Sequence, residues 1–153
     1  MESQWIESLY KSLVRNVVDI QNEIKARSIS PDMEYYAWDT RGNVTELPNV
    51  DLIGITGFSY EENEGLPVIQ IGILVSSVLD TNAFKEVQIL DVIRNACVDG
   101  DHYKTWKLRD PATGSEWAQL QVANFEIMPA GRSEVRTTRA VGIELLKTSS
   151  GSI

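Results

Sequence analysis

The sequence predicts an α+β fold, with a mixed, mainly antiparallel sheet, two helices packed on one face and a long C-terminal β-hairpin. Two segments repeat apolar residues at helical spacing, and several others place them at every second position. These segments follow one another in the order helix, strands, helix, strands. A two-layer sandwich of helices on a sheet accommodates that order.

The first helix is expected at residues 2–27, where apolar side chains recur every three or four positions. Ser30-Pro31 ends this helix, because proline lacks a backbone amide and restricts the residue before it. A short strand is expected at residues 33–38, and a polar loop rich in turn-forming residues follows at 39–49.

Two strands are predicted next, at residues 52–60 and 66–76. The segment between them, residues 61–65, has the polar, glycine-ended composition of a hairpin loop. In the second strand, isoleucine or valine occupies alternate positions from 69 to 75, which is typical of a central strand with one buried face.

A second helix is predicted at residues 82–98, with Asp80 or Thr81 as its cap and Gly100 as its stop. Its apolar stripe includes Cys97, which is the only cysteine of the chain. A single cysteine cannot form an internal disulfide, so we expect Cys97 to be a buried core thiol.

The final third of the chain is rich in strands. A strand at residues 103–109 and a proline-containing turn lead into two long strands, 116–128 and 134–147, joined by the loop 129–133. Such a long hairpin is expected to overhang its own core and to lie near a rim of the domain.

The length of 153 residues, with 42% hydrophobic and 24% charged residues, is typical of one globular domain. We assign residues 1–147 to it and expect residues 148–153 to be a disordered tail. No apolar run approaches the roughly 18 residues that span a bilayer, and the N-terminus lacks the features of a signal peptide. We therefore expect a cytoplasmic protein with no membrane partner.

The formal net charge of −8 lies in the first half of the chain. Residues 1–80 contain five Lys or Arg against thirteen Asp or Glu, whereas residues 81–153 contain nine of each sign. A protein that grips nucleic acid by its phosphates needs a basic face, so this balance argues against DNA binding as the main activity. Passive passage of DNA nearby is compatible with it.

Few residues point to catalysis. His102 is the only histidine, which excludes any site that needs two imidazoles, and we expect it to be a solvated loop residue. Gly54 and Gly57 lie within a predicted strand, where glycines mark a bulge or close packing more often than a phosphate-binding loop. We therefore assign no catalytic, cofactor-binding or metal-binding residue and predict a protein that is not an enzyme.

Acidic residues and tryptophans leave two other classes open. A metal-dependent hydrolase or nuclease would use grouped carboxylates, although solvated loop charge is the simpler interpretation of Glu61, Glu62 and Glu64 and of Asp99 and Asp101. A monomeric binding module would use exposed aromatic rings, although core or interface anchors are the more common role for Trp5, Trp38, Trp106 and Trp117.

The basic residues around the final loop are the best candidates for a subunit interface, because arginine forms bidentate pairs with carboxylates. A solvated strand edge protected by charge is the alternative. If these residues dock against the acidic part of a neighbour, at 39–51 or 61–64, the contact is head to tail and can close into a ring. The candidates are Arg132, Arg136 and Arg139, with Glu61, Glu62 and Glu64 as their acidic counterparts.

The order of these elements resembles that of the tail terminator, or tail completion, proteins of long-tailed bacteriophages. The resemblance covers nearly the whole chain and rests on the opening helix, the hairpin 52–76, the helix 82–98 and the final hairpin with the return strand SEVRTTRAVGIELL. It implies a small α+β subunit of the virion that is assembled in the host cytoplasm and forms a ring, expected to be a hexamer.

In that family the ring caps the tail tube, ends its polymerisation and joins the tail to the head connector. The resemblance therefore implies four contacts: copies of the chain itself, the tail tube protein, the connector or neck proteins, and DNA that passes through without specific binding. An acidic lumen would favour such passage, because like charges prevent phosphate contacts. Other neck subunits and the tail tube subunit are close alternatives, because they share rings and strand hairpins.

Overall fold

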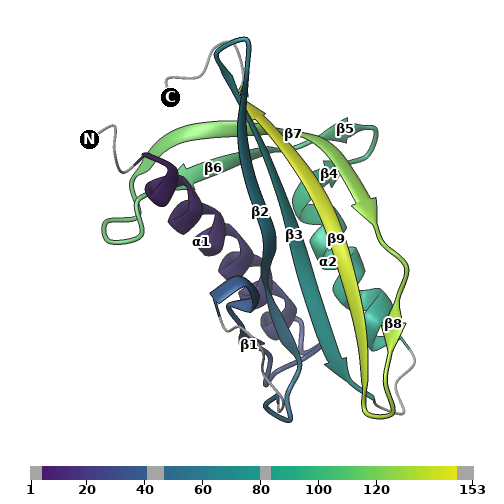
Figure 1. Cartoon of the computed structure of the whole chain (residues 1–153). Coiled ribbons are helices and arrows are strands. Elements are labelled where there is room, and N and C mark those ends of the chain that lie inside the picture. Colours follow the sequence, from purple (N-terminus) through teal and green to yellow (C-terminus); the bar gives the residue numbers. More distant parts are fainter. Residues whose placement is uncertain (1–4, 41–46, 80–83, 148–153) are drawn as a thin grey trace.

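A curled, mostly antiparallel sheet carries both helices on one of its faces (Figure 1). The computed structural model describes residues 5–40, 47–79 and 84–147, and within them the sheet contains seven strands. The predicted α+β class is therefore confirmed. The expected tail 148–153 and the candidate helix caps Asp80 and Thr81 lie outside the described residues.

The strands of the large sheet follow the order β1-β2-β3-β9-β7-β6, with β8 paired to β9. All neighbours are antiparallel except β1 and β2, which are parallel. A second, two-stranded sheet joins β4 to β5. The elements are α1 (Trp5–Ala26), β1 (Glu34–Tyr35), η2 (Trp38–Thr40), β2 (Leu52–Asn63), β3 (Leu66–Val78), α2 (Lys85–Cys97), β4 (Val98–Asp99), β5 (His102–Tyr103), β6 (Thr105–Arg109), β7 (Glu116–Ile127), β8 (Gly131–Arg132) and β9 (Arg136–Lys147).

The core lies between the helices and the concave face of the sheet. Its strand residues come from alternate positions, as the sequence pattern predicts for half-buried strands. The fully buried side chain of Cys97 belongs to this core, which confirms the prediction of a core thiol. The helical contribution consists of Leu9, Leu13, Val17, Ile20 and Ile24 from α1, and Ile89, Val92, Ile93 and Cys97 from α2.

Strand β9 has partners on both sides, because it pairs with β3 over almost its whole length and with β7 from Val141 to Lys147. The short strand β8 then folds back onto Thr137 and Thr138. The strand that carries Arg136 and Arg139 is therefore an interior strand of the sheet and not its edge. Its arginines are placed among neighbouring segments of the same chain.

The turn between β2 and β3 is tighter than the predicted five-residue loop. Glu61 and Glu62 belong to β2, and Asn63 pairs with Leu66, so only Glu64 and Gly65 connect the strands. Both have positive φ, 55° and 80°. That combination is typical of a type I′ turn, whose twist matches the twist of the strands it joins. The loop prediction was wrong in extent because Glu is an unusual first residue for such a turn.

Two other predicted elements differ from the structure. The strand expected at 33–38 is confined to Glu34–Tyr35, because the amide of Trp38 donates to the carbonyl of Tyr36 at 3.0 Å and turns the chain into a short 3₁₀ helix. The strand expected at 103–109 is divided. Its first part joins β5, so His102 lies exposed in a strand and not in a loop.

The glycine pair in β2 combines close packing with a bulge, as predicted. A Cβ atom at Gly54 would overlap the carbonyl oxygen of Tyr36. Gly57 has a φ of 67°, and the register with β3 shifts just after Thr56. The carboxylate of Asp39 accepts hydrogen bonds from the Gly57 amide at 3.1 Å and the Thr56 hydroxyl at 3.2 Å, which holds the bulge in place.

No helix among the described residues is long and apolar enough to span a membrane.

Candidate functional site

The guanidinium group of Arg136 is used inside the subunit. It donates to the carbonyl of Ser76 and to its hydroxyl, both at 3.1 Å, and to the carbonyl of Val50 at 2.9 Å. It also donates to the carbonyl of Pro48. These bonds tie the segment before β2 to the ends of β3 and β9, so Arg136 serves the fold of one subunit.

Arg139 is also engaged within the subunit. Its Nε and Nη2 atoms lie 3.0 and 2.9 Å from Oε1 of Glu86, at the start of α2, and its Nη1 donates to the carbonyl of Met128 at 3.1 Å. Side chains of this pair are only about a quarter exposed, at 27% and 24%. The pair therefore links α2 to the centre of the sheet.

Arg132 differs from the other two predicted interface arginines. It lies in β8, and its side chain is exposed and has no hydrogen-bond or ion-pair partner among the residues that the structure describes. The structure therefore does not bring the three arginines together as one exposed cluster. Sequence reasoning grouped them by their spacing, and that spacing does not reveal which backbone carbonyls lie beside Arg136.

The acidic residues Glu61, Glu62 and Glu64 form the exposed tip of the β2–β3 hairpin. β9 pairs with β3 as far as Val68, so within the described residues the tip extends beyond β9. Leu66, next to the turn, is half exposed at 50%. We call Glu61, Glu62, Glu64 and Leu66 the acidic tip. It combines three carboxylates with one apolar side chain.

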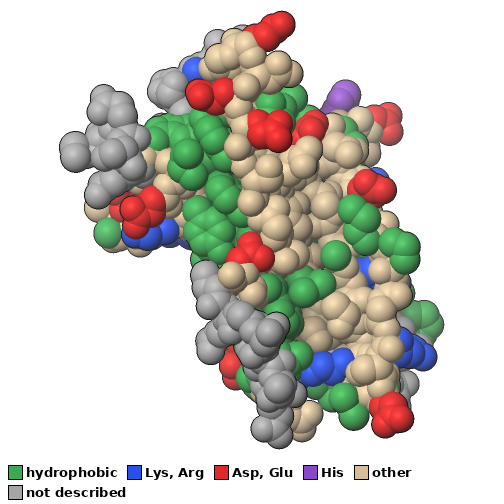
Figure 2. Space-filling model, in the orientation of Figure 1, with side chains coloured by type: hydrophobic (Ala, Val, Ile, Leu, Met, Phe, Trp, Pro, Cys, Tyr) green, Lys and Arg blue, Asp and Glu red, His purple; other side chains and the backbone are tan. Residues whose placement is uncertain are grey.

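The acidic tip and the last arginines lie at opposite ends of β3. The tip adjoins Leu66, whereas Arg136 pairs with Val78 at the other end of the strand. At about 3.3 Å per residue, the strand separates these ends by roughly 40 Å. Figure 2 shows several acidic side chains at the top of the view, near the β2–β3 turn, and basic side chains toward the opposite end of the sheet.

The carboxylates proposed for a metal site do not form a group that could hold a metal ion among the described residues. Asp99 and Asp101 lie with His102 on the small β4–β5 hairpin, where all three are exposed. Across the described ranges, no three His, Cys, Asp or Glu side chains are grouped so that they could hold a metal ion. Beside the acidic tip, burial, and then the charge and hydrogen bond of Glu62, raise the pKa of Tyr60.

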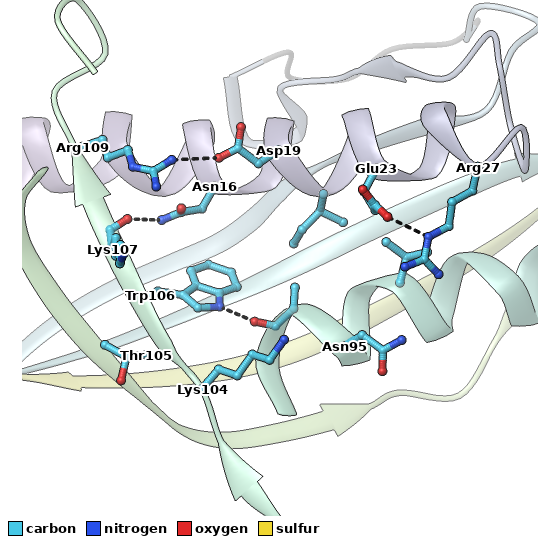
Figure 3. Close-up of a pocket in the computed structure, with 13 residues that line it drawn as sticks. Asn16, Asp19, Glu23, Arg27, Asn95, Lys104, Thr105, Trp106, Lys107 and Arg109 are labelled. Carbon is cyan, nitrogen blue, oxygen red and sulfur yellow. Dashed lines mark hydrogen bonds and ion pairs between the residues drawn. The ribbon is translucent and has the colours of Figure 1, made fainter. Parts of the chain in front are cut away.

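A groove of about 490 Å³ lies between α1, α2 and β6, on the helix side of the sheet. Figure 3 shows polar and charged side chains arranged around Trp106, with those of α1 above it and Asn95 of α2 beside it. We call this site the cationic groove, because four basic and two acidic residues line it. Its charged lining residues are Arg27, Lys104, Lys107, Arg109, Asp19 and Glu23.

Hydrogen bonds fix the walls of the cationic groove. The indole Nε1 of Trp106 donates to the carbonyl of Ala96 at 2.9 Å, which joins β6 to α2. Asn16 donates from Nδ2 to the carbonyl of Lys107 at 3.2 Å, which joins α1 to β6. Trp106 is 5% exposed, so its ring forms part of an apolar floor under the charged rim. The walls of the groove are therefore held by hydrogen bonds between α1, α2 and β6.

The four cations of the groove differ in how strongly they are paired. Arg27 contacts Glu23 at 2.7 Å, whereas Arg109 lies 3.9 Å from Asp19, at the limit of an ion pair. Lys107 lies 3.9 Å from Glu116, outside the groove. For Lys104, no ion-pair or hydrogen-bond partner of its ammonium group is found among the described residues. The groove thus has more positive than negative charge, although the protein as a whole is acidic.

Sequence reasoning did not identify the cationic groove. Its residues come from three segments, and each segment alone shows only scattered charges. The alternation of Lys107 and Arg109 with apolar Trp106 and Leu108 in the predicted strand was the one available signal. This alternation does not indicate which helix lies against the strand.

The chain matches no known family model, and no curated protein matches it.

Proposed function

We propose that the chain is a structural virion subunit that assembles with copies of itself into a ring, in the manner of a bacteriophage tail terminator. The observation that carries this proposal is the separation of unlike charges on one subunit. Three exposed carboxylates form the acidic tip, while unpaired or weakly paired cations lie on other surfaces. Such a subunit is complementary to its own copy in a head-to-tail arrangement, which generates rings.

In this proposal the ring contains six copies, caps the tail tube, ends its polymerisation and presents a surface to the head connector or neck proteins. β7 and β9 serve as the long C-terminal hairpin, with the exposed Arg132 near its turn as a contact to the next subunit. The net charge of −8 favours passage of DNA without phosphate contacts. The chain acts in the virion, after assembly in the host cytoplasm, and performs no catalysis.

The test of this proposal is the solution mass of the purified chain, measured by light scattering at several protein concentrations and at low and moderate salt. We expect a closed oligomer, with six copies as the limiting mass. Salt should shift the equilibrium toward the monomer, because it screens the charge contacts. A strict monomer under all of these conditions would contradict a self-assembling ring, and filaments of unlimited length would favour a tail tube subunit.

A further inference from the structure

From the cationic groove we infer a docking site for the acidic tip of a second copy of the chain. This inference rests on the proposed ring assembly and names the two surfaces that meet in it. The tip of one subunit would enter the groove between α1, α2 and β6 of the next. Its carboxylates would face Lys104, Lys107 and Arg109 there.

Charge is the first argument for this pairing. Three carboxylates at the tip require several cations opposite them, and the groove has an excess of two positive charges among its lining residues. Arg136 and Arg139 do not meet this requirement, because their guanidinium groups are already bonded within the subunit. Arg132 is exposed but offers a single charge.

Shape is the second argument. A two-residue turn makes the acidic tip narrow and convex, because Asn63 and Leu66 pair directly across it. The groove is an open hollow of about 490 Å³, which offers a convex hairpin end more contact than a flat surface would.

Apolar contact is the third argument. Leu66 exposes half of its side chain at the tip, at 50%, although a leucine gains free energy from burial. The floor of the groove is formed by Ile20, Val92 and Trp106, beneath the charged rim. Docking would place the leucine on that floor while the carboxylates stay at the rim, which is the usual division between the core and the rim of an interface.

The experiment measures assembly of full-length variants by light scattering. The tip variant carries Glu61→Lys, Glu62→Lys and Glu64→Lys, and the groove variant carries Lys104→Glu and Lys107→Glu. Each is expected to raise the subunit dissociation constant at least tenfold, whereas their combination restores it to within about threefold of the wild type. A matched control reverses two exposed lysines outside the groove, Lys11→Glu and Lys25→Glu, and should assemble normally.

Disulfide trapping locates the contact directly. A chain with Glu62→Cys and Lys107→Cys is expected to form linked oligomers when diamide is added, whereas a chain with Glu62→Cys and Arg132→Cys stays unlinked. The native Cys97 does not interfere, because it is fully buried. Circular dichroism of each variant checks that the monomer is folded.

The outcomes separate the two proposals. If the wild type assembles and the groove variant assembles equally well, the docking site is wrong and the ring stands. Linked oligomers only in the chain with Arg132→Cys would equally contradict the groove and assign the tip to Arg132. If reversal at the tip and in the groove each disrupts assembly but the combination does not restore it, the two surfaces have different partners and the inference fails. A wild type that never assembles overturns the ring and the docking site together.

Discussion

The ammonium group of Lys85 and the carboxylate of Asp51 form a nearly buried ion pair, 3.1 Å long, with side chains only 13% and 6% exposed. Asp51 also accepts from the hydroxyl of Ser30 at 2.6 Å and from the amide of Val78 at 2.8 Å. The Asp51 carboxylate, at the start of β2, thus joins three other segments: the loop after α1, the end of β3 and the start of α2. It holds the start of α2 against the end of β3, next to the Val50 carbonyl that Arg136 bonds.

Replacement Asp51→Asn should therefore be strongly destabilising. It removes the carboxylate charge that lies 3.1 Å from the Lys85 ammonium and gives the Ser30 hydroxyl and the Val78 amide a weaker acceptor. Breaking a buried pair in this way costs about 3 kcal/mol. Urea unfolding followed by circular dichroism measures the loss. Lys11→Ala is the matched control, because it removes an exposed pair with Glu7, 59% exposed on each side, and should change the midpoint very little. Equal effects of both changes would contradict the role given to Asp51.

The two glycines of β2 allow a second comparison. Gly54→Ala places a methyl group against the carbonyl oxygen of Tyr36, a backbone atom held by the pairing of β1 with β2. We expect a loss of about 3 kcal/mol or more in the free energy of unfolding, at the upper end of the cost of overpacking. Gly57→Ala has open space around it and meets only the strain of a positive φ, so it should cost about 1 kcal/mol.

Thermal unfolding of the two alanine variants, with the wild type beside them, checks this order. If Gly57→Ala were the more harmful change, backbone strain at the bulge would dominate over packing against Tyr36. The backbone of Tyr36 would then have to move away easily from a methyl group at position 54.

The helices and long strands could be predicted because the spacing of apolar residues that indicates each one lies within a single continuous segment. The apolar stripe of α1 and the alternation in β3 need no knowledge of the rest of the chain. The β2–β3 turn was mispredicted because a glutamate with positive φ is rare and leaves no sequence signal.

The sites were harder to predict than the elements, since they depend on the order of strands in the sheet. The cationic groove exists only because β6 lies beneath α1 and beside α2, so that Asn16 reaches the carbonyl of Lys107. Arg136 was assigned to an interface from its spacing to Arg132. Its actual acceptors include backbone carbonyls far along the chain, and any residue type can supply a carbonyl.

A third prediction separates folding from assembly at the arginines. Arg136→Met removes the donors to Ser76 and Val50 and leaves their carbonyls without these bonds, so we expect it to destabilise the subunit by about 2 kcal/mol. Arg132→Met should leave stability unchanged, because the side chain is exposed and makes no described contact. Urea unfolding at a protein concentration at which both variants are monomeric measures the difference. A destabilised Arg132→Met with an unaffected Arg136→Met would reverse the assignment.

The buried thiol of Cys97 gives the chain a stability that depends on pH. Burial raises its pKa to about 12, although the positive charge of Lys104 acts in the opposite direction. An unfolded chain has a thiol pKa near 8.5. Between these values the unfolded thiol loses its proton while the native one keeps it, so stability falls as pH rises. Below about pH 8 both states hold the proton and the contribution is complete.

Cys97→Ala isolates this effect, because the variant has no thiol to titrate and retains the tyrosines that also respond to alkaline pH. The variant should be less stable than the wild type at about pH 8, because a small core cavity is created. At about pH 10 the gap should narrow by about 1 to 2 kcal/mol, since only the wild type loses stability through its thiol. Denaturant unfolding of both proteins at the two pH values measures the gap. A gap that stays constant would mean that Cys97 titrates in the native state as it does in the unfolded chain, and would contradict the raised pKa of the buried thiol.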